Sequence, residues 1–170
     1  MNIYLIRHFI FISFKIQLLM KEIFLIKHSK GAIGLRYFGL GPNLRPSKGL
    51  LKLQQLLNKN TFWAKDRSIG DLRKCLANSD VIISIWSEKK IVGFGRALSD
   101  GIYRGVLWDI VIDQDHQGKG YGKLIVKNLL NSKKIKNTKK IYLMTTNKKF
   151  FYSQIDFKEV TSQNLLIREI

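Results

Sequence analysis

The sequence contains few cysteines and few prolines. Its one cysteine, Cys75, excludes an internal disulfide and a zinc site built from several cysteines, and it fits a reducing compartment. Cys75 stands between Lys74 and Leu76, and we interpret it as an ordinary helix residue rather than as a nucleophile. The two prolines both lie in the glycine-rich stretch 31–46, which is typical of a connector.

Acidic residues are also scarce. The chain has 12 Asp and Glu against 30 Lys and Arg, so its formal net charge is +18. Such a surface attracts anions, which include nucleic acid, acidic membranes, acidic proteins and phosphate-bearing cofactors. Charge alone does not choose among these partners.

The chain lacks an uninterrupted apolar run that could span a membrane, which needs about 20 mostly apolar residues. The N-terminal segment MNIYLIRHFIFISFKIQLLMKEIFLIKH has no acidic residue before Glu22, but polar residues interrupt it: Arg7, His8, Ser13, Lys15 and Gln17. It has neither the cleavage site of a signal peptide nor the composition of a transit peptide. We expect a variable extension, flexible or lying on a surface, or a translation start upstream of Met20.

At 170 residues the chain is most simply one domain with its own hydrophobic core. We predict a basic and apolar extension with a connector over residues 1–46, and the folded domain over residues 47–170. Leu50, Leu53, Leu56 and Leu57 form the apolar stripe of a helix. A second helix is expected to start at Ser68, the first residue of a capping-box-like S-x-x-D.

The pattern changes to strands after residue 80. VIISIWSEKKIVGFGRALSD predicts a hairpin with a turn at Ser87 to Lys90, and GVLWDIVI predicts another strand. A glycine-rich loop and a helix follow, then a strand in KIYLMTT, a short helix in NKKFFYSQIDF and final strands in KEV and NLLIREI. This order predicts an α/β fold with a mixed, mostly antiparallel central sheet flanked by helices.

The loop QGKGYGK lies between an expected strand and an expected helix. A Walker A loop is excluded because Gly118 and Gly122 are one residue too close and Leu124 stands where a Ser or Thr is needed. The dinucleotide pattern G-x-G-x-x-G fails because its third glycine position holds Lys123. The pattern that remains is Q-x-x-G-x-G, formed by Gln117, Gly120 and Gly122.

Two segments, QGKGYG and FYSQIDF, carry a resemblance to a known family. The sequence resembles the GNAT superfamily of acetyl-coenzyme A dependent N-acetyltransferases over roughly Ser47 to Ile170, with QGKGYG matching its pyrophosphate loop and FYSQIDF its late FYxxxGF-type motif. IVGFGRALSDG and WDIVIDQDHQGKGYGK are similar to the small GNAT proteins of cyanobacteria and algal plastids. Their plant chloroplast relatives include serotonin and protein-amine acetyltransferases. The resemblance, with the richness in Ile, Lys, Asn and Phe, implies that the protein is located in the plastid stroma, with the cytoplasm as the alternative.

The resemblance implies that acetyl-CoA is the co-substrate, with no metal. The loop amides and the start of the helix would bind its pyrophosphate, and a strand edge would pair with the pantetheine arm. The residues implied in this binding are Ile110, Val111, Ile112, Gln117, Gly118, Lys119, Gly120, Tyr121, Gly122, Lys123 and Asn147.

The family acetylates amines by direct attack, so the resemblance implies a proton donor and a base. Tyr152, in the late motif, would protonate the departing thiolate, with a core aromatic as the alternative. Asp109 would accept the amine proton, and His116 is a weaker candidate. Two positions depart from the family: Thr145 replaces Asn or Asp, and Asp156 replaces a glycine. These departures put the pantetheine contacts and the turn into the final strand in doubt.

Two other functions stay open. The net charge fits a basic RNA- or ribosome-associated protein on a GNAT scaffold, although no RNP-like or zinc-finger pattern is present. A sensor that binds acetyl-CoA without turnover is the other alternative. The acceptor amine, whether a small arylalkylamine, a protein lysine or a protein N-terminus, and the oligomeric state are not set by the sequence.

Overall fold

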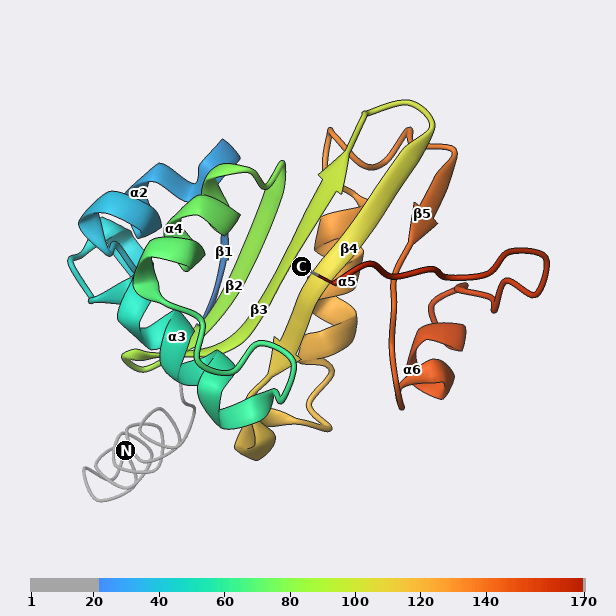
Figure 1. The fold of residues 1–170 in the computed structure, drawn as a ribbon. Coiled ribbons are helices and arrows are strands. Elements are labelled where there is room, and N and C mark those ends of the chain that lie inside the picture. The colour runs from blue at the N-terminus through green and yellow to red at the C-terminus, as the bar shows by residue number, and fades with distance from the viewer. Residues whose placement is uncertain (1–21, 170) are drawn as a thin grey trace, which may run out of the picture.

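The computed structural model describes residues 22–169 (Figure 1). Its strands are β1 (Ile23–Lys27), β2 (Val81–Ser87), β3 (Lys90–Ser99), β4 (Arg104–Ile112) and β5 (Lys140–Tyr142). Its α-helices are α2 (Ile33–Phe38), α3 (Gly49–Asn60), α4 (Ile69–Ala77), α5 (Tyr121–Leu130) and α6 (Lys149–Ser153). Short 3-10 helices lie at η1 (Lys30–Ala32), η2 (Pro42–Leu44) and η3 (Gln114–His116).

The five strands form one sheet in the order β1-β2-β3-β4-β5. The first three pairings are antiparallel and β4 pairs with β5 in parallel. This confirms the predicted α/β fold with a mixed, mostly antiparallel sheet. The expected hairpin is also present, because β2 ends at Ser87 and β3 begins at Lys90.

Helices cover both faces of this sheet, so two apolar cores form. On one face α3 and α4 pack Leu53, Leu57 and Leu76 against Trp86 and Phe94. On the other face Ile125 and Leu129 of α5 pack against Ile83 and Ile85. Successive strand residues point to opposite faces, and with both faces covered all seven residues of β2 are buried.

The predicted helix signals are confirmed. The leucine stripe of α3 is buried at all its predicted positions, Leu50, Leu53, Leu56 and Leu57. At the start of α4 the Ser68 side chain accepts a hydrogen bond from the Asp71 N–H at 3.0 Å. The Ser68 hydroxyl also donates to the Asp71 carboxylate at 2.7 Å. Such a cap is typically worth about 1 kcal/mol.

The segment before residue 47 belongs to the fold. β1 pairs with β2 along its whole length, with Phe24 opposite Trp86, and Leu35 of α2 is buried in the core under α3 and α4. The folded part therefore starts at β1, earlier than the boundary at residue 47 that the sequence predicts. The sequence prediction places the apolar run IFLIK in the N-terminal extension. In the structure its backbone pairs with β2 as an edge strand, and its side chains Phe24 and Ile26 pack against the core.

The final strands expected in KEV and NLLIREI are wrong. Residues 158–169 contain no strand, and Leu165, Leu166 and Ile167 are exposed. β-propensity describes fitness for a pleated surface and gives a strand only where a sheet edge accepts it. β5, the neighbouring edge, is only three residues long and also shorter than the KIYLMTT prediction.

Candidate functional site

β4 and β5 diverge after a short pairing. Residues Arg104 to Val106 of β4 pair with Lys140 to Tyr142 of β5. After Tyr142 the chain turns away from β4 and runs to α6 (Figure 1). From Leu107 to Ile112 the β5-side edge of β4 has no strand partner among the described residues. Its backbone N–H and C=O groups are therefore available to an extended ligand.

The glycine loop lies at the C-terminal end of this free edge. It joins η3 to α5, and both Gly118 and Gly120 adopt left-handed backbone, with φ of +75° and +78°. A Cβ atom at either position would meet nothing within 4 Å. Glycine is thus favoured by the backbone conformation, and the space in front of the loop is open.

The loop presents a row of free donors. Among residues 22–169, the N–H groups of Gly118 through Lys123 have no protein acceptor, and the first satisfied donor of this region is Leu124, which bonds to the Gly120 carbonyl at 3.0 Å. Three of these free groups are the first N–H groups of α5, where the helix dipole adds positive potential. Consecutive free amides at a helix start form an anion site.

Polar side chains of the loop hold its shape. Gln117 Nε2 donates to the Ile112 carbonyl at 3.3 Å, and Lys119 Nζ donates to the Asp115 carbonyl at 3.1 Å. Lys123 is exposed on the first turn of α5. Asn147 is exposed in the bend before α6, with no hydrogen bond of its side chain among the described residues.

A carboxylate cluster ties the loop to α3. Asp113 accepts from Lys59 Nζ at 2.9 Å, and His116 Nδ1 lies 3.2 Å from its other oxygen. Burial would raise the pKa of Asp113, but the hydrogen bonds from Lys59 and His116 outweigh it and lower the pKa to about 2. The His116 side chain is only 15% exposed, so this histidine is a structural partner of Asp113 and not a solvated loop residue.

The third glycine has a packing role. A Cβ on Gly122 would lie 3.1 Å from Cζ of Phe151, so glycine lets α6 approach the first turn of α5. Tyr152, the next residue of α6, lies at the centre of an aromatic group with Phe151 and Phe157 at ring distances of 4.9 and 5.9 Å. Burial raises the pKa of Tyr152 to about 12, so its phenol is protonated at neutral pH.

Asp109 lies at an irregularity of β4. Its φ is +53°, and the pairing of β3 with β4 shifts by one residue opposite Phe94 to Arg96, which is a β-bulge. The Asp109 side chain is 4% exposed, and its Oδ2 accepts from Arg96 Nε at 2.6 Å and from Arg67 Nη1 at 3.0 Å. An oxygen already shared by two charged donors is poorly suited to accept an amine proton.

Sequence reasoning missed the two arginines of this cluster. Arg96 interrupts the apolar strand IVGFGRAL, just as Asp109 interrupts GVLWDIVI. A lone charge inside an apolar strand needs a partner when buried. The sequence could therefore have predicted an ion pair between Arg96 and Asp109. Arg67 comes from the loop before α4, and no local pattern marks it. Both arginines also lie beside tryptophan rings, Trp108 at 5.9 Å and Trp63 at 5.8 Å.

The geometry agrees with comparisons to known proteins. A family model described as an acetyltransferase (GNAT) domain matches residues 78–159. That range contains β2 to β5, the glycine loop and α6. Residues 78–159 match a GNAT acetyltransferase domain.

Relatives of this GNAT domain include proteins described as chloroplastic. An uncharacterized N-acetyltransferase ycf52 of Pyropia yezoensis is 39% identical over 85 residues, 48% of each chain. A GCN5-related N-acetyltransferase 1 of Arabidopsis thaliana, described as chloroplastic, is 28% identical and covers 54% of this chain and 48% of that one. The chain spans 48% to 63% of the length of the first three curated relatives it matches.

A solved structure supports the same fold. An acetyltransferase of the GNAT family from Xanthomonas campestris superposes with a TM-score of 0.66 at 20% identity, over 89% of this chain and 95% of that chain. At this identity the likeness shows the fold alone. Within residues 22–169 the GNAT domain has no cluster of three or more potential metal ligands.

Proposed function

We propose that the protein is an acetyl-CoA dependent N-acetyltransferase that transfers an acetyl group to a primary amine by direct attack. The observation that carries the proposal is the row of free N–H groups from Gly118 to Lys123 at the end of the unpaired β4 edge. The free N–H groups fit a diphosphate, and the unpaired strand edge fits an extended arm that contains amides.

The backbone supplies most of the cofactor recognition. Each hydrogen bond to a charged acceptor is worth about 1.5–3 kcal/mol, so several loop amides outweigh the helix dipole at about 0.3–1 kcal/mol. The pantetheine arm would pair with the edge at Ile110, Val111 and Ile112, as an added strand does. The thioester would then lie where β4 and β5 separate, near Trp108 and Asp109.

The chemistry needs little from the protein beyond position and one proton donor. The amine nitrogen attacks the thioester carbonyl, the new C–N bond forms, and the C–S bond breaks with the electron pair leaving on sulfur. Tyr152 would protonate this thiolate. Burial keeps the phenol protonated at neutral pH, but its pKa of about 12 exceeds the ordinary thiol pKa of about 8.5, so the transfer needs help from the site. Cys75 takes no part: burial raises the pKa of its thiol, which disfavours a nucleophilic thiolate.

Two proposals stay open for deprotonation of the amine: Asp109 acts as the base, or the reaction uses no protein base. Asp109 was predicted to accept the amine proton, but its bonds to Arg67 and Arg96 favour a role in fixing the β-bulge. An amine with pKa near 10.4 is only about one part in a thousand neutral at neutral pH, whereas a protein α-amine near 7.7–8.0 needs little help. Without a base, the geometry favours acceptors of low pKa.

The location is proposed as the plastid. Relatives described as chloroplastic support it, together with the richness in Ile, Lys, Asn and Phe, which suits an AT-rich organelle genome. The acceptor class is the finer question, with arylalkylamines, protein lysines and protein N-termini as the candidates.

The test incubates the full chain with acetyl-CoA and a panel of these three amine classes, and follows free CoA release. We expect release with at least one class, and a loss of about 100-fold or more in kcat for Tyr152→Phe with unchanged acetyl-CoA affinity. Phe150→Leu, an exposed neighbour on α6, is the matched control and should keep its rate. Acetyl-CoA binding without CoA release on any amine would instead identify a sensor.

A further inference from the structure

Exposed large apolar side chains gather in the short segment between β1 and α3. Ile33, Tyr37, Phe38 and Leu44 are 51%, 64%, 67% and 79% exposed. Ile33 and Tyr37 lie four residues apart on α2 and share a face, whereas Leu35 on the opposite side is buried against α3. Single exposed apolar residues are ordinary, but four within twelve residues give this segment an unusual share of exposed apolar side chains.

Cations alternate with these apolar residues. Arg36, Arg45 and Lys48 stand beside them in the chain, and residues 23–65 hold eight Lys and Arg with no Asp or Glu. We name the combined surface of Ile33, Arg36, Tyr37, Phe38, Leu44, Arg45, Lys48 and Arg73 the α2 face. It offers apolar groups and positive charge together.

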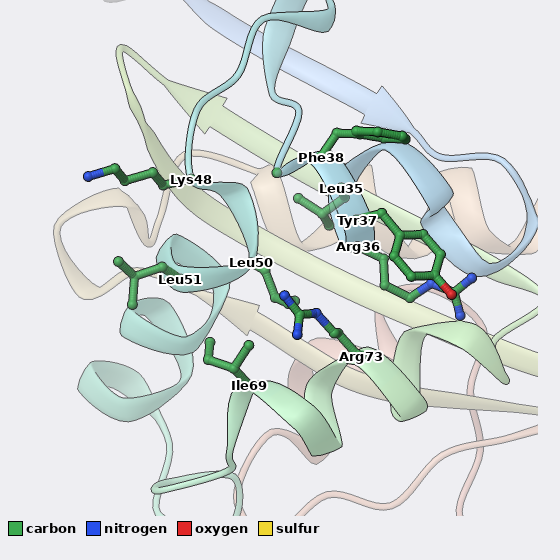
Figure 2. Close-up of a pocket in the computed structure, with 10 residues that line it drawn as sticks. Leu35, Arg36, Tyr37, Phe38, Lys48, Leu50, Leu51, Ile69 and Arg73 are labelled. Carbon is green, nitrogen blue, oxygen red and sulfur yellow. The ribbon is translucent and has the colours of Figure 1, made fainter.

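A groove of about 300 Å³ opens in the α2 face, between α2, α3 and α4 (Figure 2). Leu35, Leu50 and Ile69 lie within it, and Arg73 points from α4 towards Leu50 (Figure 2). Arg36 lies 4.5 Å from the centre of the Tyr37 ring. The ten lining residues include no carboxylate.

The arginines of the groove lack an anion. Arg36 Nε is buried and has no hydrogen-bond partner within the described chain. Over residues 22–169, neither Arg36 nor Arg73 forms an ion pair with a carboxylate. An enclosed guanidinium donor without an acceptor is costly, so an external anion at Arg36 would be stabilising.

We propose that the α2 face binds an anionic lipid bilayer, with headgroup phosphates on Arg36 and Arg73 and the exposed apolar side chains in the interfacial region. Nucleic acid would use the cations and the aromatic rings but would leave Ile33 and Leu44 without a role. Apolar residues among Lys and Arg are the pattern of peripheral membrane contacts. This attachment needs no spanning segment, and the described residues contain no helix able to cross a bilayer.

The α2 face lies on the β1 side of the sheet, whereas the glycine loop and the β4 edge lie beyond β3 (Figure 1). Membrane attachment would therefore leave the acetyl-CoA site accessible. The proposal stands independently of acetyl transfer, and it would bring the protein to amines at a membrane surface.

The experiment measures co-sedimentation of the full chain with vesicles of phosphatidylcholine alone, and with about one third phosphatidylglycerol. We expect binding to the anionic vesicles only. Each basic residue at the surface contributes about fivefold to the partition coefficient, so Arg36→Gln/Arg45→Gln/Lys48→Gln should lower it about 100-fold. Tyr37→Ser/Phe38→Ser/Leu44→Asn should lower it at least about tenfold, and asparagine tolerates the φ of +55° at Leu44.

The control Lys133→Gln/Lys134→Gln/Lys136→Gln removes the same charge from an exposed stretch after α5. It should keep the partition coefficient within about threefold. Equal loss in this control, or equal binding to neutral vesicles, overturns the proposal. It is also overturned if the full chain binds short single-stranded RNA through the α2 face more tightly than it binds anionic vesicles. Thermal unfolding of each variant checks that the fold is retained.

Discussion

Replacing Asp109 with asparagine removes the anion that two guanidinium groups share. Arg96 Nε and Arg67 Nη1 lie 2.6 and 3.0 Å from the same carboxylate oxygen, in a site where the Asp109 side chain is 4% exposed. Removing one partner from a buried ion pair costs about 3–5 kcal/mol because the remaining charge stays poorly solvated. The Arg67 side chain is 30% exposed and can turn to solvent, so we expect the lower end, about 3 kcal/mol.

A loss of this size is measurable by thermal unfolding. For a chain of this length each kcal/mol lowers Tm by about 2–4 °C, so Asp109→Asn should lower it by about 6–12 °C. Asp115→Asn is the control, because the Asp115 carboxylate is 78% exposed in its pair with Lys59, and it should leave Tm nearly unchanged. Adding Arg67→Gln to Asp109→Asn should cost less than the sum of the single changes, since the two groups interact directly.

The opposite result would refute the structural reasoning. If Asp109→Asn unfolds at the wild-type temperature, binds acetyl-CoA normally and loses acetyl transfer, then Asp109 is the base and its arginine contacts contribute little stability.

Three further predictions concern the fold and the loop. Burial lowers the pKa of His28 from 6.5 to about 4, so its contribution to the free energy of unfolding is fully present above pH 6.5 and is lost as pH falls towards 4. Ring-proton NMR titration measures this pKa, and His28→Gln should reduce the dependence of the denaturation midpoint on pH between 6.5 and 4. The lowered pKa of Asp113, about 2 against an ordinary 3.8, means that its contribution is present above about pH 4 and lost as pH falls through 2, and Asp113→Asn should remove this acid dependence of the denaturation midpoint. Gly122→Ala should lower Tm, because its Cβ would meet Phe151 Cζ at 3.1 Å, and Phe151→Leu should recover part of the loss.

The patterned parts of the fold were predictable from the sequence. Leucine spacing gave α3, the Ser68 cap gave the start of α4, and the order strand, glycine loop and helix is found as predicted at β4 and α5. These features depend on local periodicity and turn chemistry. The same is true of Gly118 and Gly120, whose left-handed backbone is the conformation that glycine favours.

The parts that escaped prediction depend on distant contacts. The segment 158–169 has strand-like composition but no strand, because pairing needs an edge that local sequence does not specify. The left-handed φ of Asp109 and its contact with Arg67, which is 42 residues away in the chain, follow from the bulge in β4. The role of Asp109 therefore needed the structure, and so did the groove of the α2 face.

The central claim is that the amides from Gly118 to Lys123 bind the diphosphate of acetyl-CoA. Gly120 and Gly101 have nearly the same φ, +78° and +82°, with nothing within 4 Å of an added Cβ. Alanine should strain both sites equally, but only Gly120 lies in the loop. Calorimetric titration with acetyl-CoA should show binding that Gly120→Ala weakens about tenfold or more and Gly101→Ala leaves unchanged. Absence of heat with the wild-type chain, or equal affinities for the two variants, would contradict the account.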